Sequence, residues 1–183
     1  MGQKSARKSY AHILAIIGCL IGLSGFNSEI ARLDADYVEV WTTPSAATSL
    51  DFEYEADEGL TSNQEDIVEE LVDEQIKEEV PEALGYLVYF PYAIMTLVGL
   101  LGLLGFRNWG RNLAFMCLGL SVGLLTASVA TDVVLPKFLE AMAPERVEAK
   151  VETGAAVSRM MTGSILAFVA SLVGLIRPDR RGE

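Results

Sequence analysis

The chain has 183 residues, 51% of them hydrophobic, and a formal net charge of −11. Its mean hydropathy is nevertheless positive, +0.32, so apolar and acidic residues must occupy different segments. One histidine and two cysteines are too few for the common zinc, haem or iron–sulfur sites. No phosphate-binding glycine loop and no basic stripe for nucleic acid is present. We therefore predict no catalytic residue, no cofactor, no metal and no nucleic-acid partner.

Four apolar runs are long enough for helices that cross a membrane. The predicted spans are 9–28, 83–106, 112–135 and 153–176, the last on the condition that Arg159 is tolerated. A helix needs roughly 20 apolar residues to cross a hydrocarbon core about 30 Å thick, and lipid requires its backbone groups to bond within the helix. The sequence predicts an all-α membrane fold: a four-transmembrane-helix bundle, with a small acidic exoplasmic α+β insert, 29–82, between the first two helices.

The distribution of Lys and Arg predicts the orientation of this bundle. Segments 1–8, 107–111 and 177–183 hold eight basic residues in 20 positions, whereas 27–82 and 136–152 together hold five in 73. Basic residues concentrate in the cytoplasmic loops of membrane proteins. We expect a multi-pass protein of the bacterial inner (plasma) membrane with the N-terminus, the turn 107–111 and the tail in the cytoplasm. The insert and a loop over 136–152 then face outside, and Trp109 is expected to anchor the inner interface.

The first span has an alternative interpretation. The segment Ile16-Ile17-Gly18-Cys19 follows a basic start and resembles a lipoprotein cleavage site, which would leave Cys19 lipidated. The apolar run continues through Leu23, whereas a lipoprotein usually becomes polar after its cysteine. We favour an uncleaved helix and keep processing at Cys19 as the alternative.

Small residues recur at four-residue spacing and predict where helices approach each other closely. In lipid, helix association depends on such residues because burial of apolar surface gives no net drive. Packing within one bundle is the favoured interpretation, and a homo-oligomer interface is the alternative. The predicted packing residues are Gly18, Gly22, Gly119, Gly123, Gly163 and Ala167.

Two ionisable residues lie near the outer ends of the last two spans. Asp132 is 21 residues from Arg111, and Arg159 is 18 from Arg177, which places them at about 31 and 27 Å by the helical rise. We predict that Asp132 and Arg159 are neighbours. A structural pair is favoured, and an outer vestibule of a transporter is the alternative.

The insert combines strand and helix patterns. Residues 27–82 contain 18 Asp or Glu, and alternation near 37–42 and 50–55 predicts an antiparallel pair of strands. We expect Trp41, Phe52 and Tyr54 on a common apolar face. Calcium binding is an alternative role for the insert, although its acidic residues do not have the spacing of an EF-hand loop. The candidate ligands are Asp51, Glu53, Glu55, Asp57 and Glu58.

A helix is predicted near 63–80 in the same insert. The residues Ser62-Asn63-Gln64-Glu65 match a capping box, and apolar residues recur at helical spacing after it. We expect this helix to cover the strands or the outer surface of the bundle.

The turn Arg107-Asn108-Trp109-Gly110-Arg111 resembles the Arg-x-Trp-Ala-Arg turn of many small, uncharacterised bacterial four-helix membrane proteins, with Gly110 in place of the usual Ala. The ending Leu175-Ile176-Arg177-Pro178-Asp179-Arg180 is similar to the ending of the same group. The resemblance implies the four-helix topology and no activity. The loop layout is also similar to claudin-type membrane proteins, but their paired loop cysteines are not matched, so we set that likeness aside.

These patterns favour a non-enzymatic accessory, scaffold or interaction subunit that contacts the lipid bilayer and a protein partner or further copies of itself. Its interaction candidates are Trp41, Phe52, Tyr54, Asp132 and Arg159. The alternative is a small oligomeric transporter or channel with a vestibule at Asp132 and Arg159. A membrane enzyme using Glu140 or Glu145 with Asp132 is the third and least favoured alternative.

Overall fold

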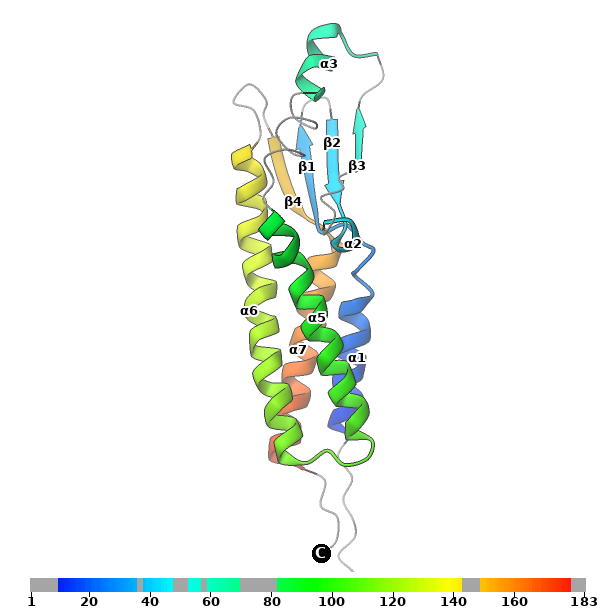
Figure 1. The fold of residues 1–183 in the computed structure, drawn as a ribbon, viewed down its shortest axis with the longest axis vertical. Coiled ribbons are helices and arrows are strands. Elements are labelled where there is room, and N and C mark those ends of the chain that lie inside the picture. The colour runs from blue at the N-terminus through cyan, green and yellow to red at the C-terminus, as the bar shows by residue number, and fades with distance from the viewer. Residues whose placement is uncertain are drawn as a thin grey trace, which may run out of the picture. The chain divides into compact units, whose positions relative to one another are not determined.

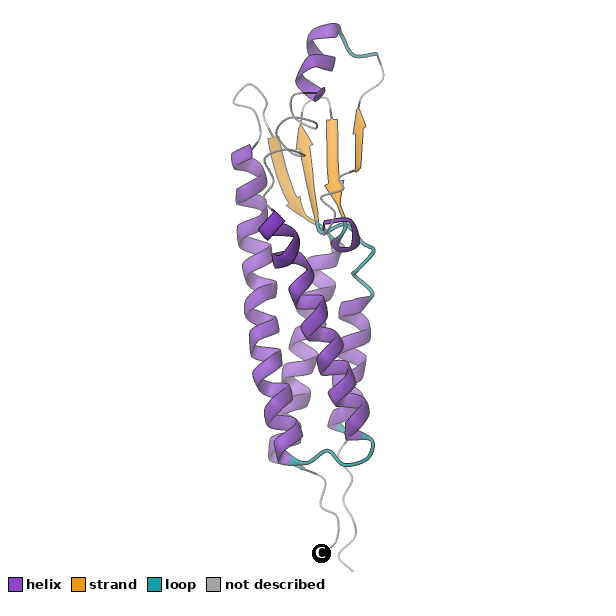
Figure 2. Ribbon diagram, viewed as in Figure 1, coloured by secondary structure: helices purple, strands orange, loops and turns teal. Residues whose placement is uncertain are grey.

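The computed structural model describes residues 10–35, 38–47, 53–56, 59–69, 82–142 and 149–178. The described chain is mostly helical and contains one antiparallel sheet (Figures 1 and 2). It divides into two compact units. The bundle unit comprises residues 1–23, 91–128 and 159–183, and the sheet unit comprises residues 24–90 and 129–158.

Four helices carry most of the apolar sequence: α1 (Ala11–Leu23), α5 (Glu82–Gly105), α6 (Arg111–Met142) and α7 (Ala155–Ile176). Three of them, α5, α6 and α7, are long and apolar enough to cross a membrane. The described part of α1 has 13 residues and extends about 20 Å, less than the thickness of a hydrocarbon core. Three membrane-length helices are thus evident, and the fourth span stays a prediction.

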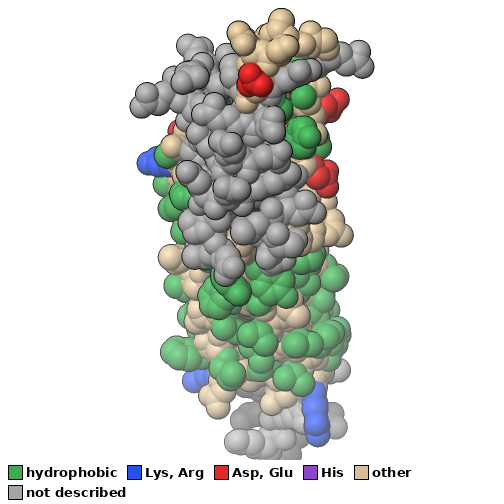
Figure 3. All heavy atoms as spheres, turned by 45° about the horizontal axis from the view of Figure 1, so that its top comes forward, with side chains coloured by type: hydrophobic (Ala, Val, Ile, Leu, Met, Phe, Trp, Pro, Cys, Tyr) green, Lys and Arg blue, Asp and Glu red, His purple; other side chains and the backbone are tan. Residues whose placement is uncertain are grey.

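The bundle unit buries small and polar residues and exposes large apolar ones. On the part of α6 that belongs to this unit, the buried positions are Ala114, Cys117, Ser121, Leu124 and Ser128, which follow one another in steps of three and four. This is the spacing of helices that pack side by side around a shared seam. The large apolar side chains point outward, as Figure 3 shows for the visible face of the helices, and Phe115 and Met116 are among them. Such a surface suits lipid, since soluble chains rarely expose apolar patches of this extent.

Glycines bring α1 against α7 within this unit. A Cβ added at Gly163 would lie 2.5 Å from the carbonyl oxygen of Gly18 and 2.9 Å from the amide nitrogen of Gly22. A Cβ added at Gly18 would lie 3.1 Å from the backbone nitrogen of Ala167. Only residues without bulk permit backbones to approach this closely.

Gly119 and Gly123 behave differently from the other predicted packing residues. Both are exposed on α6, and among the described residues nothing lies within 4 Å of a Cβ built at either position. Packing inside the bundle, the favoured expectation, is therefore wrong for these two. Their four-residue spacing places them on one helix face, which lies opposite the buried seam of α6.

The sheet unit is built on four strands: β1 (Ala31–Ala35), β2 (Val38–Thr42), β3 (Glu53–Ala56) and β4 (Ala149–Thr153). Their order is β3-β2-β1-β4, and every pairing is antiparallel. Strands β2 and β3 occupy the two predicted positions and pair with each other. Strands β1 and β4 were not predicted, although two strands alone would be marginally stable.

Strand β4 corrects two of the predicted boundaries. The segment 136–152 was expected to be a loop, but α6 continues to Met142 and β4 begins at Ala149. The sheet is therefore not confined to the segment between the first two apolar helices, because it takes one edge strand from the chain after α6. The pairing joins residues more than 110 positions apart, such as Leu33 and Val151.

One face of the sheet forms the core of its unit. Ala31, Leu33, Val38 and Val40 are buried in alternation along β1 and β2. They pack in one cluster with side chains from four helical segments of the same unit: Val68 of α3 (Ser62–Glu69), Val88 of α5, Leu135 and Leu139 of α6, and Val157 of α7. A short helix, α2 (Pro44–Ala47), follows β2.

The cap of α3 lies one residue earlier than predicted. The side-chain oxygen of Gln64 accepts hydrogen bonds from the backbone nitrogen and the hydroxyl of Thr61, both at 2.8 Å. The backbone N–H of Gln64 donates in return to the backbone carbonyl of Thr61. Thr61 and Gln64 thus form a capping pair one residue before the predicted pair, and the side chain of Glu65 lies outside what the structure describes. The remainder of the helix predicted to residue 80 lies outside the described residues.

Candidate functional site

The polar face of the sheet carries two rows of side chains. Directly paired residues of an antiparallel sheet point to the same side, so the strand register determines which residues are neighbours. We define the polar face by its two rows across β3, β2, β1 and β4, which are Glu53, Trp41, Arg32 and Glu152, and Glu55, Glu39, Asp34 and Lys150.

The same register corrects the predicted aromatic patch. Trp41 pairs with Glu53, whereas Tyr54 pairs with Val40. Trp41 therefore lies on the polar face and Tyr54 on the apolar face, where it is an exposed edge residue. Phe52 lies outside the described residues. The prediction that Trp41 and Tyr54 share an apolar face is wrong. The alternation within each strand does not determine which residues of the two strands pair.

Arg32 lies near the middle of the polar face and holds two carboxylates. Its guanidinium donates to Glu29 Oε1 at 2.7 Å and to Glu39 Oε2 at 3.0 Å. The hydrogen bond and the charge of Glu29, followed by the charges of Glu39 and Asp34, raise the pKa of Arg32 above its ordinary value. Arg32 consequently remains charged at every pH at which the protein would function.

Lys150 and Glu152 form a second ion pair at the β4 edge. Their Nζ and Oε1 atoms are 2.5 Å apart, and both side chains are exposed. This contact raises the pKa of Lys150 and lowers the pKa of Glu152. A pair so exposed contributes little stability, because water screens it. Lys150 is paired with Asp34 across the strands, so one positive charge lies beside Asp34.

Three carboxylates stand side by side on this face. Glu55 is paired with Glu39, and Glu39 is paired with Asp34. Residues directly opposite in an antiparallel pair have Cβ atoms about 4.5–5.5 Å apart, and like charges at that distance destabilise the sheet. Trp41 is the neighbour of this acidic row, and its indole nitrogen donates to Glu53 Oε2 at 3.0 Å. An aromatic ring beside closely spaced carboxylates is suited to binding cationic side chains.

Only part of the predicted calcium site lies within the described residues. Within the described ranges, no group of three or more His, Cys, Asp or Glu side chains is placed to hold a metal ion. Of the five candidate calcium ligands, Glu53 and Glu55 lie on the polar face. Asp51, Asp57 and Glu58 lie outside the described residues.

Asp132 and Arg159 are assigned to different units. Asp132 belongs to the α6 segment of the sheet unit, and Arg159 to the α7 segment of the bundle unit. Their predicted contact, and the vestibule of the transporter alternative that depends on it, stay predictions.

Sequence reasoning missed Asp34 and Glu39 as site residues. Their signal was present, because residues 31–42 alternate apolar and polar side chains around a short break, which is typical of a hairpin. Lys150 and Glu152 had no such signal, since their position depends on a long-range pairing.

Three membrane-length helices with outward apolar side chains are the features of an integral membrane protein. No protein-family model matches the chain, and no curated protein matches it in sequence.

Proposed function

We propose that the chain is a four-span membrane protein that acts as a non-enzymatic accessory or interaction subunit. Its polar face docks a Lys- or Arg-rich segment of a partner protein outside the membrane. The observation that carries this proposal is the acidic row, Glu55, Glu39 and Asp34, in which like charges are direct neighbours. Arg32 and Lys150 offset part of the repulsion in this row, and binding of a cationic segment would relieve the remainder.

The charges of the two units support the proposed orientation. The bundle unit contains nine Lys or Arg and two Asp or Glu, whereas the sheet unit contains five and 23. Basic residues favour the cytoplasmic side, so the turn between α5 and α6 would lie in the cytoplasm and the sheet unit outside.

Contacts of α1 support the fourth span. Gly18 of α1 lies against Gly163 of α7, and the Cys19 thiol donates to the carbonyl oxygen of Met95 on α5 at 3.1 Å. A helix packed among apolar membrane-length helices shares their surroundings. The uncharged run extends from residue 9 to residue 28, about the length of a membrane span, and α1 covers Ala11–Leu23 of it.

The topology can be tested by cysteine labelling. Both native cysteines are buried, so an added surface cysteine dominates the reaction with a membrane-impermeant maleimide. In intact cells Asn63→Cys, on exposed α3, should be labelled, whereas Asn108→Cys, in the exposed turn after α5, should react only after permeabilisation. Labelling of Asn108→Cys in intact cells would contradict the orientation.

The docking face can be tested by neutralising charge while the Arg32–Glu39 pair stays intact. The tagged full chain is isolated from native membranes in mild detergent, and the proteins it retains are quantified. The variant Asp34→Asn/Glu55→Gln should retain the partner about a hundredfold less, since two charge-assisted contacts are lost and each is worth about tenfold. Raising the salt to about 1 M should release the partner from the unaltered chain.

The matched control removes two negative charges elsewhere in the same unit. Asp66 on α3 and Glu140 on α6 are both exposed, and neither belongs to the strands that carry the polar face. The variant Asp66→Asn/Glu140→Gln should retain the partner as the unaltered chain does. Equal losses in the two variants, or no retained protein that depends on Asp34 and Glu55, would disprove docking at this face.

A further inference from the structure

Strand β3 is the outermost strand on one side of the sheet (Figure 1). Within the described ranges it pairs with β2 alone. A strand with one neighbour turns half of its backbone N–H and C=O groups outward, where a further strand can pair with them. Glu53, Tyr54 and Glu55 are exposed. The outer side of β3, which we call the β3 edge, is therefore a place where the described sheet can gain one strand.

The apolar face of the sheet is incompletely covered at the β3 edge. Ala56, opposite Val38, packs against the core of the sheet unit. Tyr54 is opposite Val40, but Val40 is 3% exposed whereas Tyr54 is 51% exposed. An aromatic side chain in this position gains cover when another strand brings an apolar residue opposite it.

The polar face at the same edge carries only negative charge. The two β3 residues on this face are Glu53 and Glu55, opposite Trp41 and Glu39. Suppose that two copies of β3 paired antiparallel with their polar faces on one side. Glutamate would then stand opposite glutamate, and like charges in that position are unfavourable. The β3 edge thus disfavours a second copy of the chain and favours a strand with Lys or Arg at alternate positions.

We propose that the partner's cationic segment joins the sheet as a fifth strand beside β3. Its basic residues lie opposite Glu53 and Glu55, and the residue between them is apolar and covers Tyr54. The partner motif is therefore basic–apolar–basic in an extended segment. In such strand addition the backbone hydrogen bonds supply affinity, and the alternate side chains supply specificity. This inference rests on the proposed function and specifies how the partner binds.

The first test uses backbone methylation of a peptide probe. A fluorescent peptide of about six residues, alternating Lys and Val, is added to the full chain in detergent and its anisotropy is followed. Two further versions carry N-methyl groups on the backbone nitrogens of either the Lys or the Val residues. In an added strand, the N–H groups of alternate residues face β3 and the others face water. One version should bind at least about tenfold more weakly than the unmodified peptide, and the other within about twofold of it. Equal binding, or equal loss, in the two versions would overturn strand addition.

The second test changes Tyr54, which lies on the face opposite the acidic row. Tyr54→Thr keeps a residue suited to strands and should weaken binding of the unmodified peptide about fivefold, the upper value for one cross-strand pair. A segment that only covered the polar face would not depend on Tyr54. Circular dichroism should show equal secondary structure in the variant and the unaltered chain.

The matched control is Tyr86→Thr, which removes a tyrosine that is 71% exposed on α5. Tyr and Thr have similar helix propensities, so this variant should change peptide binding less than about twofold. Equal losses in the two variants would contradict a role of Tyr54 at the β3 edge. A dimer of the unaltered chain that Tyr54→Thr converts to a monomer would overturn the assignment in favour of a second copy.

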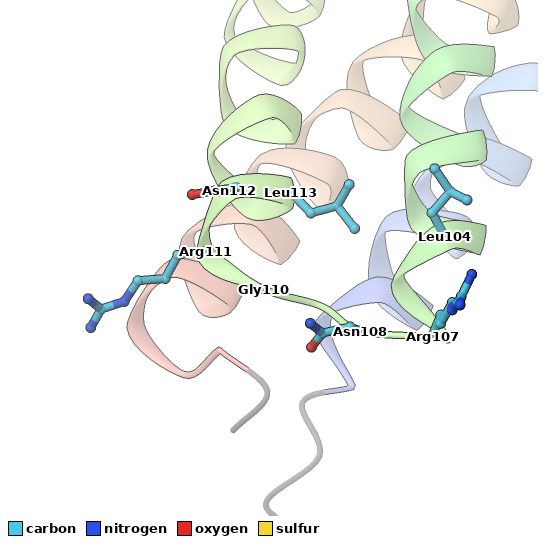
Figure 4. A pocket seen from close by; sticks show the side chains of 7 residues that line it. All are labelled: Leu104, Arg107, Asn108, Gly110, Arg111, Asn112 and Leu113. Atoms are coloured by element: carbon cyan, nitrogen blue, oxygen red, sulfur yellow. The ribbon is translucent and has the colours of Figure 1, made fainter. Parts of the chain in front are cut away.

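A failure of strand addition is distinguishable from a failure of the proposed function. If the two N-methylated versions bind alike while Asp34→Asn/Glu55→Gln still loses the partner, the polar face docks the segment without strand addition. If that variant keeps the partner, the proposed function itself fails. The labelling of Asn108→Cys, on the loop between α5 and α6 in Figure 4, tests the membrane topology and is unaffected by either outcome.

Discussion

Replacing Trp109 with alanine is expected to lower the free energy of unfolding of the bundle unit by about 3 kcal/mol. The Trp109 side chain is fully buried in a cluster with Ala11, Ala15, Ala114 and Ala170. Truncation would leave a cavity that these small neighbours cannot fill. We take the lower end of the range for Trp→Ala because the loss in lipid is one of packing rather than of transfer from water.

Two glycines explain why the ring fits this place. A Cβ added at Gly105 would lie 3.1 Å from Cζ3 of Trp109, and one added at Gly174 would lie 2.8 Å from Cδ1. The ring is thus held between α5 and α7, and the centroid of the His12 ring of α1 lies 6.3 Å from its own. Trp109 links three helices within one unit.

Thermal unfolding in detergent, followed by the helical circular dichroism signal, measures this effect. The matched control is Trp41→Ala, which removes the other tryptophan from a half-exposed position on the sheet. The control should shift the midpoint by only a few degrees, whereas Trp109→Ala should shift it considerably more. Equal shifts would show that Trp109 is a surface anchor rather than part of the packing.

Replacing Gly163 with valine is expected to separate α1 from α7 and to cost about 3 kcal/mol, the upper end of the range for overpacking. The obstructing atoms belong to the backbone of Gly18 and Gly22, so no side chain can rotate away. The helix α1 must therefore move as a whole.

The thiol of Cys19 reports this separation. Cys19 is buried and bonded to the Met95 carbonyl, while Cys117 is fully buried and serves as an internal reference. In detergent, Gly163→Val should expose Cys19 to maleimide and leave Cys117 protected. A Cys19 that stays protected in Gly163→Val would contradict the close contact of α1 and α7.

The matched control is Gly123→Val, which adds the same isopropyl side chain where the described chain has nothing within 4 Å. It should leave Cys19 protected. A homo-oligomer interface was the alternative role predicted for Gly119 and Gly123. If the chain forms oligomers through this exposed face of α6, Gly123→Val should also lower the oligomeric state.

Trp109 also shows a limit of reasoning from the sequence. A tryptophan in a turn between apolar spans is typical of an interfacial anchor, and we expected one. Its burial depends on Gly105 and Gly174, which lie on two different helices and leave room for the ring. Nothing in the turn itself indicates that these glycines meet there.

The sequence by itself determined the helices and much of the local strand structure. Uncharged runs near 20 residues predict membrane helices because lipid cannot bond to stray backbone groups, and α5, α6 and α7 are long and apolar enough for this role. Alternation predicted the positions of β2 and β3 because side chains of a strand point to opposite faces in turn.

Only the tertiary structure decided which of these elements are neighbours and which faces they share. The acidic row exists because of the register between β1, β2 and β3. The polar face is completed by β4, which follows α6 in the sequence. A shift of register by one residue would turn Trp41 and every carboxylate of its strand to the opposite face. Such long-range pairing is stabilised by the burial of Leu33, Val40 and their helical neighbours in one core. The free energy of this burial depends on the whole unit, so no local pattern in the sequence indicates it.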